Sequence, residues 1–338
     1  MNSLKKISII IISYNELEYL EDAIKSCLNQ DIIDDIEIVI GDDGSDDGSI
    51  GLINRYSRKY SNIIKYFIMD RSDINTKMII PSIRVSNIIK RAMDYVTGEY
   101  IMIMSGDDYN IESDRLSVQL TLLEKEKKYK SCYCDYQKIW DNGQKKDVIT
   151  QSFLGNRAFW SGIYVHISCF LFEKECFDSS LERFCDDTGM IYSILATGKS
   201  KHIEKMGFAY RQREKSIMHK ADVLELNLLE LLLFQDCING GQMKTSSYSR
   251  FSRPFTYVFL HRKVLNNEKY QKYIEESRKY NNDFIGGIIG FDDSKLYIKI
   301  KLLMLLLKTI FFMLTWNGIR IICRIIPYRR GDVHFWGN

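Results

Sequence analysis

Runs of apolar residues alternate with amphipathic segments through the first third of the chain. Apolar runs of this length are typical of strands buried in a parallel sheet, and apolar residues at three- and four-residue spacing indicate helices. Repeated strand–helix units predict an α/β fold whose mostly parallel sheet is flanked by helices on both faces and joined by right-handed crossovers. The predicted strands cover residues 7–12, 36–40, 63–69 and 100–104, and the predicted helices cover 17–28, 49–60 and 83–96.

The pattern changes after residue 130. Residues 131–139 and 145–150 flank an Asn-Gly pair, which accepts the positive φ angles of a tight turn and so predicts a hairpin. Residues 167–172 predict a further short strand, and residues 188–197 predict a helix that ends at Gly198. This part of the chain is expected to form a small mixed region beside the parallel sheet.

The length of 338 residues allows one large domain or two medium ones, and a hydrophobic content of 45% is ordinary for a globular protein. From about residue 221 onward the pattern is helical. We therefore predict an α/β domain over residues 1–220 and a helical C-terminal extension over residues 221–338. The formal charge of +3, from 47 basic and 44 acidic residues, gives no indication of a nucleic-acid partner.

The eight cysteines contain no CxxC pair and no zinc-type spacing, so we expect reduced and mostly buried thiols. Lys5 and Lys6 precede a short apolar run, but that run is too short for a signal peptide and has no cleavage pattern. The protein is therefore expected in the cytoplasm.

Two acids follow the fourth predicted strand directly. Residues 99–110 read EYIMIMSGDDYN, so the apolar run leads into Ser-Gly-Asp-Asp at 105–108. The carboxyl ends of strands in open α/β sheets face the ligand crevice, which favours a ligand or metal site there. A divalent ion needs few protein carboxylates when a diphosphate completes its shell. The alternative is a turn in which Asp108 or Ser113 caps the next helix.

A second acidic segment, IVIGDDGSDDGS, follows the second predicted strand. Its carboxylates repel phosphate but accept hydrogen bonds, which suits a ribose or the imino group of uracil. The alternative is a solvated loop that caps the helix at Ser49.

The segment Ser13-Tyr14-Asn15-Glu16 stands between the first strand and the first helix. The start of that helix is expected to offer free N–H groups, and Tyr14 could contact a flat base. An ordinary helix cap is the alternative.

A fourth segment contains two acidic residues followed by a cluster of basic residues. Asp186-Asp187 precede the helix predicted at 188–197, where a carboxylate could act as a general base, while cations could neutralise a departing phosphate. The alternative is a helix cap followed by a solvated basic face. The basic residues that follow are Arg211, Arg213, Lys215, His219 and Lys220.

In their order along the chain, these segments resemble the inverting family-2 glycosyltransferases, which have the GT-A fold. The opening SIIIISYNELEYLEDAIKSCLNQ matches the family's strand, (T/S)-Y-N and helix, and IGDDGSDDGS matches its VDDGSxDGS. The segment from Gly98 to Asp108 matches GEYI…DD, and the segment from Asp186 to Ser216 matches ED…L…GK…YR…S. The resemblance covers roughly residues 5–220.

The resemblance implies transfer of a sugar from a nucleotide-diphosphate donor, with a UDP-sugar favoured, with inversion at the anomeric carbon. The acceptor would be a hydroxyl of a saccharide or lipid-linked saccharide in bacterial surface polysaccharide synthesis. Asp187 would match the base that deprotonates the acceptor, and Asp107 would match the acid that binds Mg2+ or Mn2+. The donor-binding positions would be Ser13, Tyr14, Glu16, Asp42, Asp43, Lys77, Arg84, Gly106, Asp107, Arg211 and Arg213.

Two positions depart from the family pattern. Ser105 stands where the first acid of the DxD motif is expected, and Arg213 stands in the histidine position of YRxHxxS. The arginine would exchange a metal ligand for a fixed cation that suits phosphate geometry.

Other classes of protein stay open from the residues alone. The serine at 105 leaves room for a non-catalytic nucleotide-sugar-binding or scaffold protein. A nucleotidyltransferase is less favoured, because no glycine-rich basic loop for a triphosphate follows the first strand. His166 is expected to be a hydrogen-bonded structural residue or an acceptor contact.

The C-terminal segment 294–330 holds eight Lys or Arg and no acid, between the apolar runs LLMLLL and TIFFMLTW. Lys308 interrupts the apolar run, and the remaining apolar stretch is too short and too charged to predict a helix that spans a membrane. An interfacial helix on the inner membrane surface, which would make the protein peripheral there, is one interpretation. The alternative is a helix packed on the domain or on a partner in a homodimer.

Overall fold

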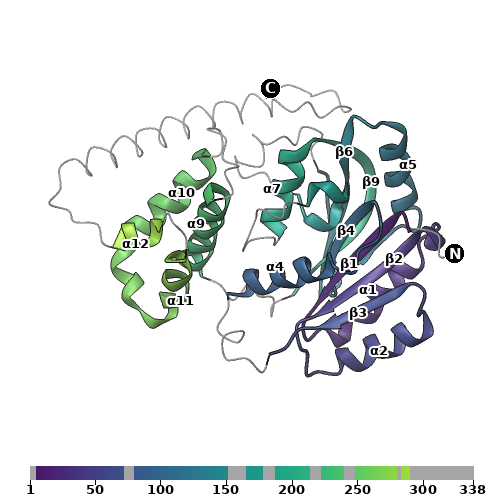
Figure 1. The fold of residues 1–338 in the computed structure, drawn as a ribbon, viewed down its shortest axis with the longest axis horizontal. Helices are drawn as coiled ribbons and strands as arrows, with labels where there is room; N and C mark the ends of the chain where they lie inside the picture. The colour runs from purple at the N-terminus through teal and green to yellow at the C-terminus, as the bar shows by residue number, and fades with distance from the viewer. Residues whose placement is uncertain are drawn as a thin grey trace. The chain divides into compact units, whose positions relative to one another are not determined.

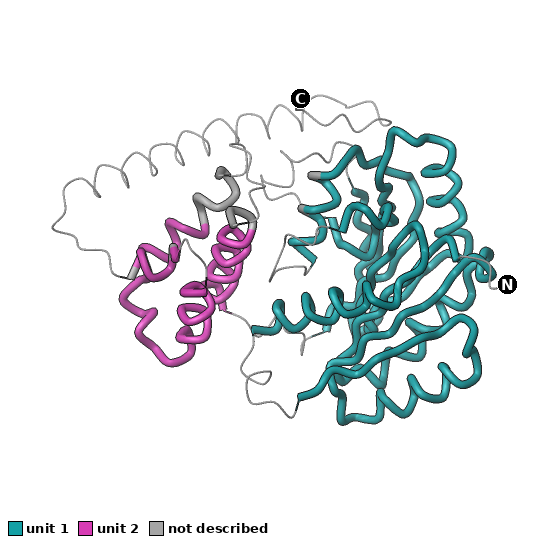
Figure 2. The backbone as a smooth tube through the Cα atoms, in the orientation of Figure 1, with its two compact units in different colours: residues 1–155, 164–216, 332–338 teal, residues 156–163, 217–331 magenta. Residues whose placement is uncertain are grey.

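The computed structural model describes residues 5–71, 80–150, 165–177, 187–213, 222–239, 248–279 and 283–289. Residue contacts divide the chain into two compact units, which Figure 2 shows in different colours. The first unit holds the described residues up to Arg213, and the second holds those from Asp222 onward. The α/β pattern of the sequence lies in the first unit and the helical pattern in the second.

Four strands at the start of the chain form the parallel part of the sheet (Figure 1). Their order is β3-β2-β1-β4, so the chain winds outward from β1 to β3 and then returns to the other side of β1. The strands are β1 (Ile7–Ser13), β2 (Ile36–Asp42), β3 (Ile64–Ile68) and β4 (Tyr100–Ser105).

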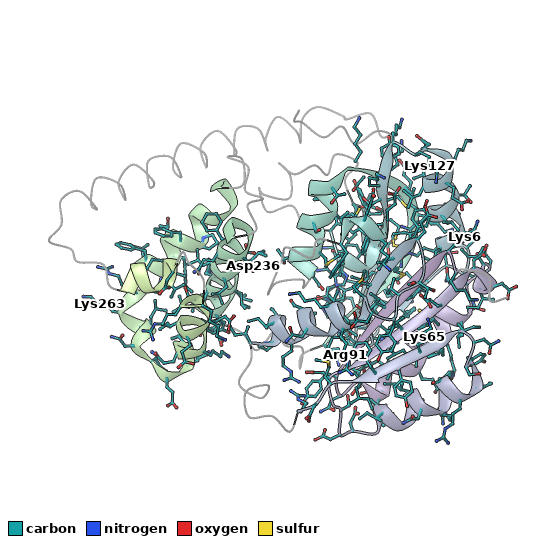
Figure 3. All side chains as sticks on the ribbon, in the orientation of Figure 1. Lys6, Lys65, Arg91, Lys127, Asp236 and Lys263 are labelled. Atoms are coloured by element: carbon teal, nitrogen blue, oxygen red, sulfur yellow. The ribbon has the colours of Figure 1, made fainter. Side chains whose placement is uncertain are left out.

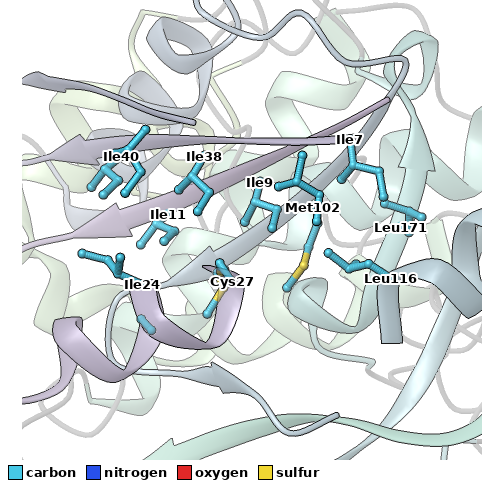
Figure 4. Packing of buried hydrophobic residues seen from close by; sticks show 14 of the residues in the cluster. Ile7, Ile9, Ile11, Ile24, Cys27, Ile38, Ile40, Met102, Leu116 and Leu171 are labelled. Carbon is cyan, nitrogen blue, oxygen red and sulfur yellow. Dashed lines mark hydrogen bonds between the residues drawn. The ribbon is translucent and has the colours of Figure 1, made fainter. Parts of the chain in front are cut away.

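Helices pack on both faces of this parallel part, as the sequence predicts. Ile7, Ile9 and Ile11 of β1 lie in one buried cluster with side chains of α1, α2 and α5, part of which is drawn in Figure 4. Helix α4 packs against β1 and β2 on the opposite face, where a side chain at Gly41 would meet Ile88. The helices are α1 (Leu17–Leu28), α2 (Ser49–Lys59), α4 (Pro81–Ala92) and α5 (Arg115–Lys125).

The sheet continues beyond β4 as a mixed region. Strand β8 is antiparallel to β4 and β6, while β9 is parallel to β6 and antiparallel to the short β5. The sheet order is therefore β4-β8-β6-β9-β5, with β7 paired to β6. The elements are β5 (Tyr109–Asn110), β6 (Tyr129–Trp140), β7 (Lys145–Val148), β8 (Phe170–Glu173), α7 (Asp187–Thr197) and β9 (Lys199–Gln212).

The sequence predictions for this region need three corrections. Strand β9 was not expected, since its segment was interpreted only as a basic face. The strand expected at 167–172 begins with a 3-10 turn, Ile167–Cys169. Helix α5 has Asp114 at its N-cap without a side-chain cap hydrogen bond, so neither Asp108 nor Ser113 caps it.

The second unit is helical in its described part. Lys269 of α11 forms ion pairs with Asp222 and Glu225 at the start of α9, at 2.8 and 3.0 Å, and Tyr273 donates a hydrogen bond to Glu225. Among the described residues, no helix has the length and apolarity to cross a bilayer. The helices are α9 (Val223–Asn239), α10 (Tyr248–Leu260), α11 (Glu268–Ser277) and α12 (Phe284–Ile289).

The cysteine prediction is confirmed where side chains are described. Five cysteines are free and buried, and burial raises the pKa of the Cys27 and Cys176 thiols to about 12. Lysines such as Lys6, Lys65 and Lys127 lie on the surface of the first unit (Figure 3). The Cys27 and Cys176 thiols are therefore protonated core side chains, and the lysines remain in solvent.

Candidate functional site

The candidate site lies where the winding of the sheet reverses. Strand β1 has β2 on one side and β4 on the other, and its register pairs Ser13 with Asp42 and Ile12 with Ser105. The carboxyl ends of three strands, each followed by one of the polar segments of the sequence, thus meet at one edge. Ligands of open α/β sheets bind in the crevice at such a switch point.

The acidic loop after β2 is held by its own serines and by the β1–α1 turn. Both carboxylate oxygens of Asp42 accept hydrogen bonds from Ser45, at 2.8 Å from its N–H and 2.7 Å from its hydroxyl. Asp46 and Asn15 exchange two hydrogen bonds of 2.9 Å. Asn15 has a φ of 52°, which asparagine tolerates better than most residues. These contacts fix the turn that carries Tyr14 and Glu16.

The same loop corrects the prediction of free N–H groups at the start of α1. The backbone N–H of Asn15 donates to Ser45 Oγ, that of Glu16 to Ser49 Oγ, and that of Leu17 to Asp47 Oδ2. These groups are therefore occupied within the protein. The acidic loop therefore acts partly as a helix cap, which was the alternative interpretation of its sequence. Asp47 accepts hydrogen bonds from the backbone N–H of Leu17 in α1 and from that of Ser49 in α2.

Asp43 differs from its neighbours because it faces two arginines. Arg84 of α4 forms a forked ion pair with both oxygens of Asp43, with an Nε–Oδ2 distance of 2.6 Å, and both side chains are about nine-tenths buried. Arg71 lies 3.8 Å from the same carboxylate, and its guanidinium lies 3.8 Å from the centre of the Tyr14 ring. Tyr14 remains 40% exposed. An aromatic face, a carboxylate and two arginines are thus gathered beside the first two strands.

The end of β4 brings Asp107 against Glu16 and Arg213. The guanidinium of Arg213 forms an ion pair with Asp107 Oδ2 and another with Glu16 Oε1 at 3.0 Å. Gly106 permits this approach, since a Cβ atom there would lie 2.6 Å from Glu16 Oε2. That Oε2 atom is buried and has no hydrogen-bond partner within the described structure. Burial, then the charge of Asp107, raises the pKa of Glu16 well above its usual value.

Asp108 and Arg211 join β4 to β9. Asp108 Oδ1 accepts from the Arg211 backbone N–H at 2.9 Å, and burial raises the pKa of Asp108 well above normal. The Arg211 side chain donates to the Asp107 carbonyl at 2.8 Å and pairs with Asp22 at 2.7 Å. Arg211 therefore fixes the position of Asp107, and Arg213 contacts its carboxylate.

Asp187 is the first residue of α7, and its charge acts on Tyr210 of β9. Burial raises the pKa of the Tyr210 hydroxyl to about 12, and the charges of Asp108, Asp187 and Asp107 add to the shift. The Tyr210 ring centre lies 4.5 Å from that of His166. Asp107 and Asp187, far apart in the sequence, thus act on one side chain of β9.

The surroundings of Asp107 combine features that favour a divalent ion with features that oppose one. Glu16 Oε2 and Asp108 Oδ2 are buried carboxylate oxygens without hydrogen-bond partners in the described structure, which favours a cation nearby. Against this, Arg213 already pairs with Asp107. A divalent ion beside Arg213 would therefore meet the repulsion of a like charge.

The remaining ligands are also few. Ser105 supplies no carboxylate, and no three His, Cys, Asp or Glu side chains are arranged to hold a metal among the residues described. While Arg213 keeps its contact with Asp107, the residues present do not fit a resident divalent ion.

A cavity of about 450 Å³ lies beside Arg211 of β9. It is lined by residues that include Tyr19, Trp140 and Arg211. Neighbouring residues of a strand point to opposite faces, so Arg211 and Tyr210 direct their side chains apart. The cavity therefore lies on the Arg211 side of β9, and the Tyr19 ring that lines it is 5.2 Å from the Arg213 guanidinium.

Several predicted positions lie outside the described residues, namely Lys77, Asp186, Lys215, His219 and Lys220. The structure adds residues that the sequence did not indicate, Arg71, Ser45 and Tyr210, because their contacts come from other elements. A run of acids separated by serines could have suggested Ser45, whereas nothing local marked Arg71 or Tyr210.

Comparison with known proteins agrees with this fold. Residues 8–77 match the model of the family described as glycosyl transferase family 2. Residues 1–349 of TarS from S. aureus, in complex with UDP-GlcNAc, superimpose with a TM-score of 0.57 at 16% identity. That alignment covers 84% of this chain and 81% of the TarS chain. The fold is therefore of the GT-A type, as predicted, and residues 8–77 are similar to the family-2 glycosyltransferases.

Curated relatives match over shorter stretches. A cholesterol galactosyltransferase of Borreliella burgdorferi is 34% identical over 113 residues, which are 33% of this chain and 28% of the relative. The putative glycosyltransferase EpsE of Bacillus subtilis is 31% identical over 129 residues, 38% of this chain and 42% of EpsE. The chain thus matches less than half the length of either relative.

Proposed function

We propose that this protein transfers a sugar from a nucleotide-diphosphate donor to an acceptor hydroxyl. The observation that supports the proposal is that Asp43, Asp107 and Arg213 lie at the carboxyl edge of the sheet, while the charge of Asp187 acts on Tyr210 of β9. Asp43 suits the nucleoside of a nucleotide donor, and Arg213 beside Asp107 suits its diphosphate, whose charge a cation neutralises. A nearby carboxylate such as Asp187 suits proton transfer from a hydroxyl.

The nucleoside would bind beside Asp43 and Tyr14. An ionised carboxylate accepts hydrogen bonds from a base imino group or ribose hydroxyls, and an aromatic face stacks on a base. Arg84 would orient Asp43, since the forked ion pair fixes the plane of the carboxylate. A UDP-sugar is the donor we favour, and the TarS structure that shares this fold contains UDP-GlcNAc.

We propose that Asp42 does not bind the donor, although the resemblance implies that it does. Its oxygens hold Ser45, so we propose that Asp42 shapes the loop and that Asp43 meets the donor. Ser13 would likewise position the turn, and Glu16 would position Arg213.

The diphosphate would bind next to Asp107 and Arg213. The resemblance implies Mg2+ or Mn2+ at Asp107, which the residues present do not fit while Arg213 pairs with that acid. Arg211 holds the Asp107 backbone, and Arg213 faces the carboxylate. Both arginines add positive charge where the departing nucleoside diphosphate gains negative charge.

Asp187 would remove the proton from the acceptor hydroxyl as that oxygen attacks the anomeric carbon from the side opposite the diphosphate. The bond from the anomeric carbon to the diphosphate oxygen breaks as the new glycosidic bond forms, which inverts the configuration. We propose a saccharide or lipid-linked saccharide as acceptor, at the inner membrane surface and in bacterial surface polysaccharide synthesis.

Replacement of the base tests this proposal. We expect Asp187→Asn to lower transfer of radiolabelled sugar by about 100-fold to 10,000-fold, the usual contribution of a general base, while donor affinity stays within about twofold. Asp114→Asn is the matched control, because that exposed acid pairs with Lys205 on the surface. Wild-type turnover in the Asp187 variant would contradict the assignment. Donor binding by the wild type without any transfer would favour a non-catalytic binding protein.

A further inference from the structure

Arg213 sits at the centre of the acidic edge. Its guanidinium contacts Asp107 of the β4 end and Glu16 of the β1–α1 turn, and it lies 5.2 Å from the centre of the Tyr19 ring. Its side chain is 19% exposed, so a ligand at the edge can still reach it. One cation is thus held by two acids and a ring from separate segments.

These contacts make Arg213 a charge of fixed position. The charges of Asp107 and Glu16 raise the pKa of its guanidinium, so that it stays protonated at every working pH. A guanidinium also presents its N–H groups in a planar fork that matches two phosphate oxygens. Neither property depends on solution conditions, unlike the occupancy of an exchangeable ion.

Both departures from the family pattern at this edge make the site less suited to a metal ion. Ser105 removes one anionic ligand, and Arg213 adds a permanent cation beside the carboxylate that remains. A carboxylate paired with arginine is a poor ligand for a second cation, because the ion must displace or approach a like charge.

We propose that Arg213 takes the place of the divalent ion, so that the chain binds the donor diphosphate without a metal. This inference rests on the proposed function, because it concerns the same donor site. Asp107 and Glu16 then act as anchors that hold the guanidinium towards the diphosphate. The arginine neutralises charge on the leaving nucleoside diphosphate during transfer.

Calorimetry with nucleoside diphosphates tests the inference in the wild-type protein. UDP, GDP, ADP, CDP and dTDP are titrated into the full chain in EDTA and then with Mn2+ in excess. We expect the tightest of them to bind with affinities that agree within about threefold in the two conditions. Binding that needs Mn2+, with a gain of about tenfold or more, would overturn the inference and leave the proposed function standing. No binding of any of the five in either condition would overturn both.

A pair of variants makes the test specific to the residue. We expect Arg213→His to lose about tenfold or more in affinity in EDTA and to regain most of it with Mn2+, which the new imidazole and Asp107 can hold together. Electron paramagnetic resonance of Mn2+ in the presence of diphosphate should show protein-bound ion for this variant and not for the wild type.

Arg55→His is the control, since Arg55 is an exposed residue of α2 whose side chain is 66% accessible. It should match the wild type in both conditions. An Arg213→His variant that binds in EDTA as tightly as wild type would contradict the inference. If that variant does not fold, Arg213→Lys retains the charge and should still bind in EDTA, and the wild-type comparison stands without either variant.

Discussion

Buried carboxylates at the strand ends differ in what holds them. Asp43 is held by a forked arginine pair, Asp42 by a serine, and Asp107 by an arginine from a distant strand. A carboxylate removed from water needs such partners, because leaving it unpaired costs several kcal/mol. The partner of each acid therefore indicates whether that acid shapes the protein or meets a ligand.

Asp43→Asn is expected to weaken nucleotide binding. The amide cannot accept at both former oxygens, and the buried Arg84 loses its ionised partner, so unfolding free energy should also fall by about 3 kcal/mol. Calorimetric titration with nucleotide and urea unfolding measure the two effects. Asp46→Asn in the same loop is the control, since Asp46 is exposed and pairs with Asn15. Equal nucleotide affinities for the two variants would contradict the role of Asp43.

His166 is expected to make stability depend on pH. Burial lowers its pKa from 6.5 to about 4, so the folded protein resists a proton that the unfolded chain accepts. Stability should be unaffected above pH 6.5, fall as the pH drops from 6.5 to about 4, and then level off, with a total loss of about 3 kcal/mol.

Urea unfolding of the wild type and of His166→Gln between pH 7.5 and 4.5 isolates this effect from other groups. The difference in unfolding free energy between the two proteins should shrink as the pH falls. A difference that stays constant with pH would show that His166 is not buried as a neutral ring.

At the scale of elements, β1, β2 and β4 were predictable because most of their residues are apolar and buried on both faces. Strand β9 was not, since its segment KSKHIEKMGFAYRQ carries charges through its first half and buries polar residues such as Ser200 and His202. His202 is buried because Asp135 of β6 lies 2.9 Å from it, a partner that local sequence does not reveal. Helix α4 ends at Ala92, before the predicted end at residue 96.

Substitutions at two glycines test the packing around the parallel strands of the sheet. A Cβ atom at Gly98 would lie 2.7 Å from the Ser8 backbone nitrogen, beside the buried contact of Ser8 with Glu37. We expect Gly98→Ala to lower the unfolding free energy by about 1 to 3 kcal/mol, because backbone must move to relieve the overlap.

Gly51→Ala is the matched control, because Gly51 lies in α2 with no atom within 4 Å of an added Cβ. Alanine favours helix over glycine, so stability should rise by up to about 1 kcal/mol. Thermal or urea unfolding measures both. Destabilisation by Gly51→Ala, or none by Gly98→Ala, would be inconsistent with this packing.

At the scale of the whole molecule, the sequence indicated which segments carry chemistry but not how they meet. The order β3-β2-β1-β4 brings the ends of β1 and β4 together, and the unexpected β9 delivers Arg211 and Arg213 to Asp107. These pairings join residues about a hundred positions apart, so only long-range topology sets them. The roles of individual site residues stay predictions.

The basic C-terminal segment 294–330 lies outside the described residues, and its membrane role stays a prediction. Deletion of residues 294–338 should release the protein from the membrane pellet after cell fractionation, because apolar burial and lipid charge would be lost together. Substitution of its eight basic residues by glutamine should give partial release. Unchanged partition after the deletion would dismiss an interfacial helix.

The central claim is that one edge of the sheet binds a sugar nucleotide. A crystal structure of the protein with UDP or the best-binding nucleoside diphosphate tests it most directly. The account predicts density for the base beside Tyr14 and Asp43 and for the diphosphate at Arg213. A nucleotide bound elsewhere, with no density at these residues, would contradict it.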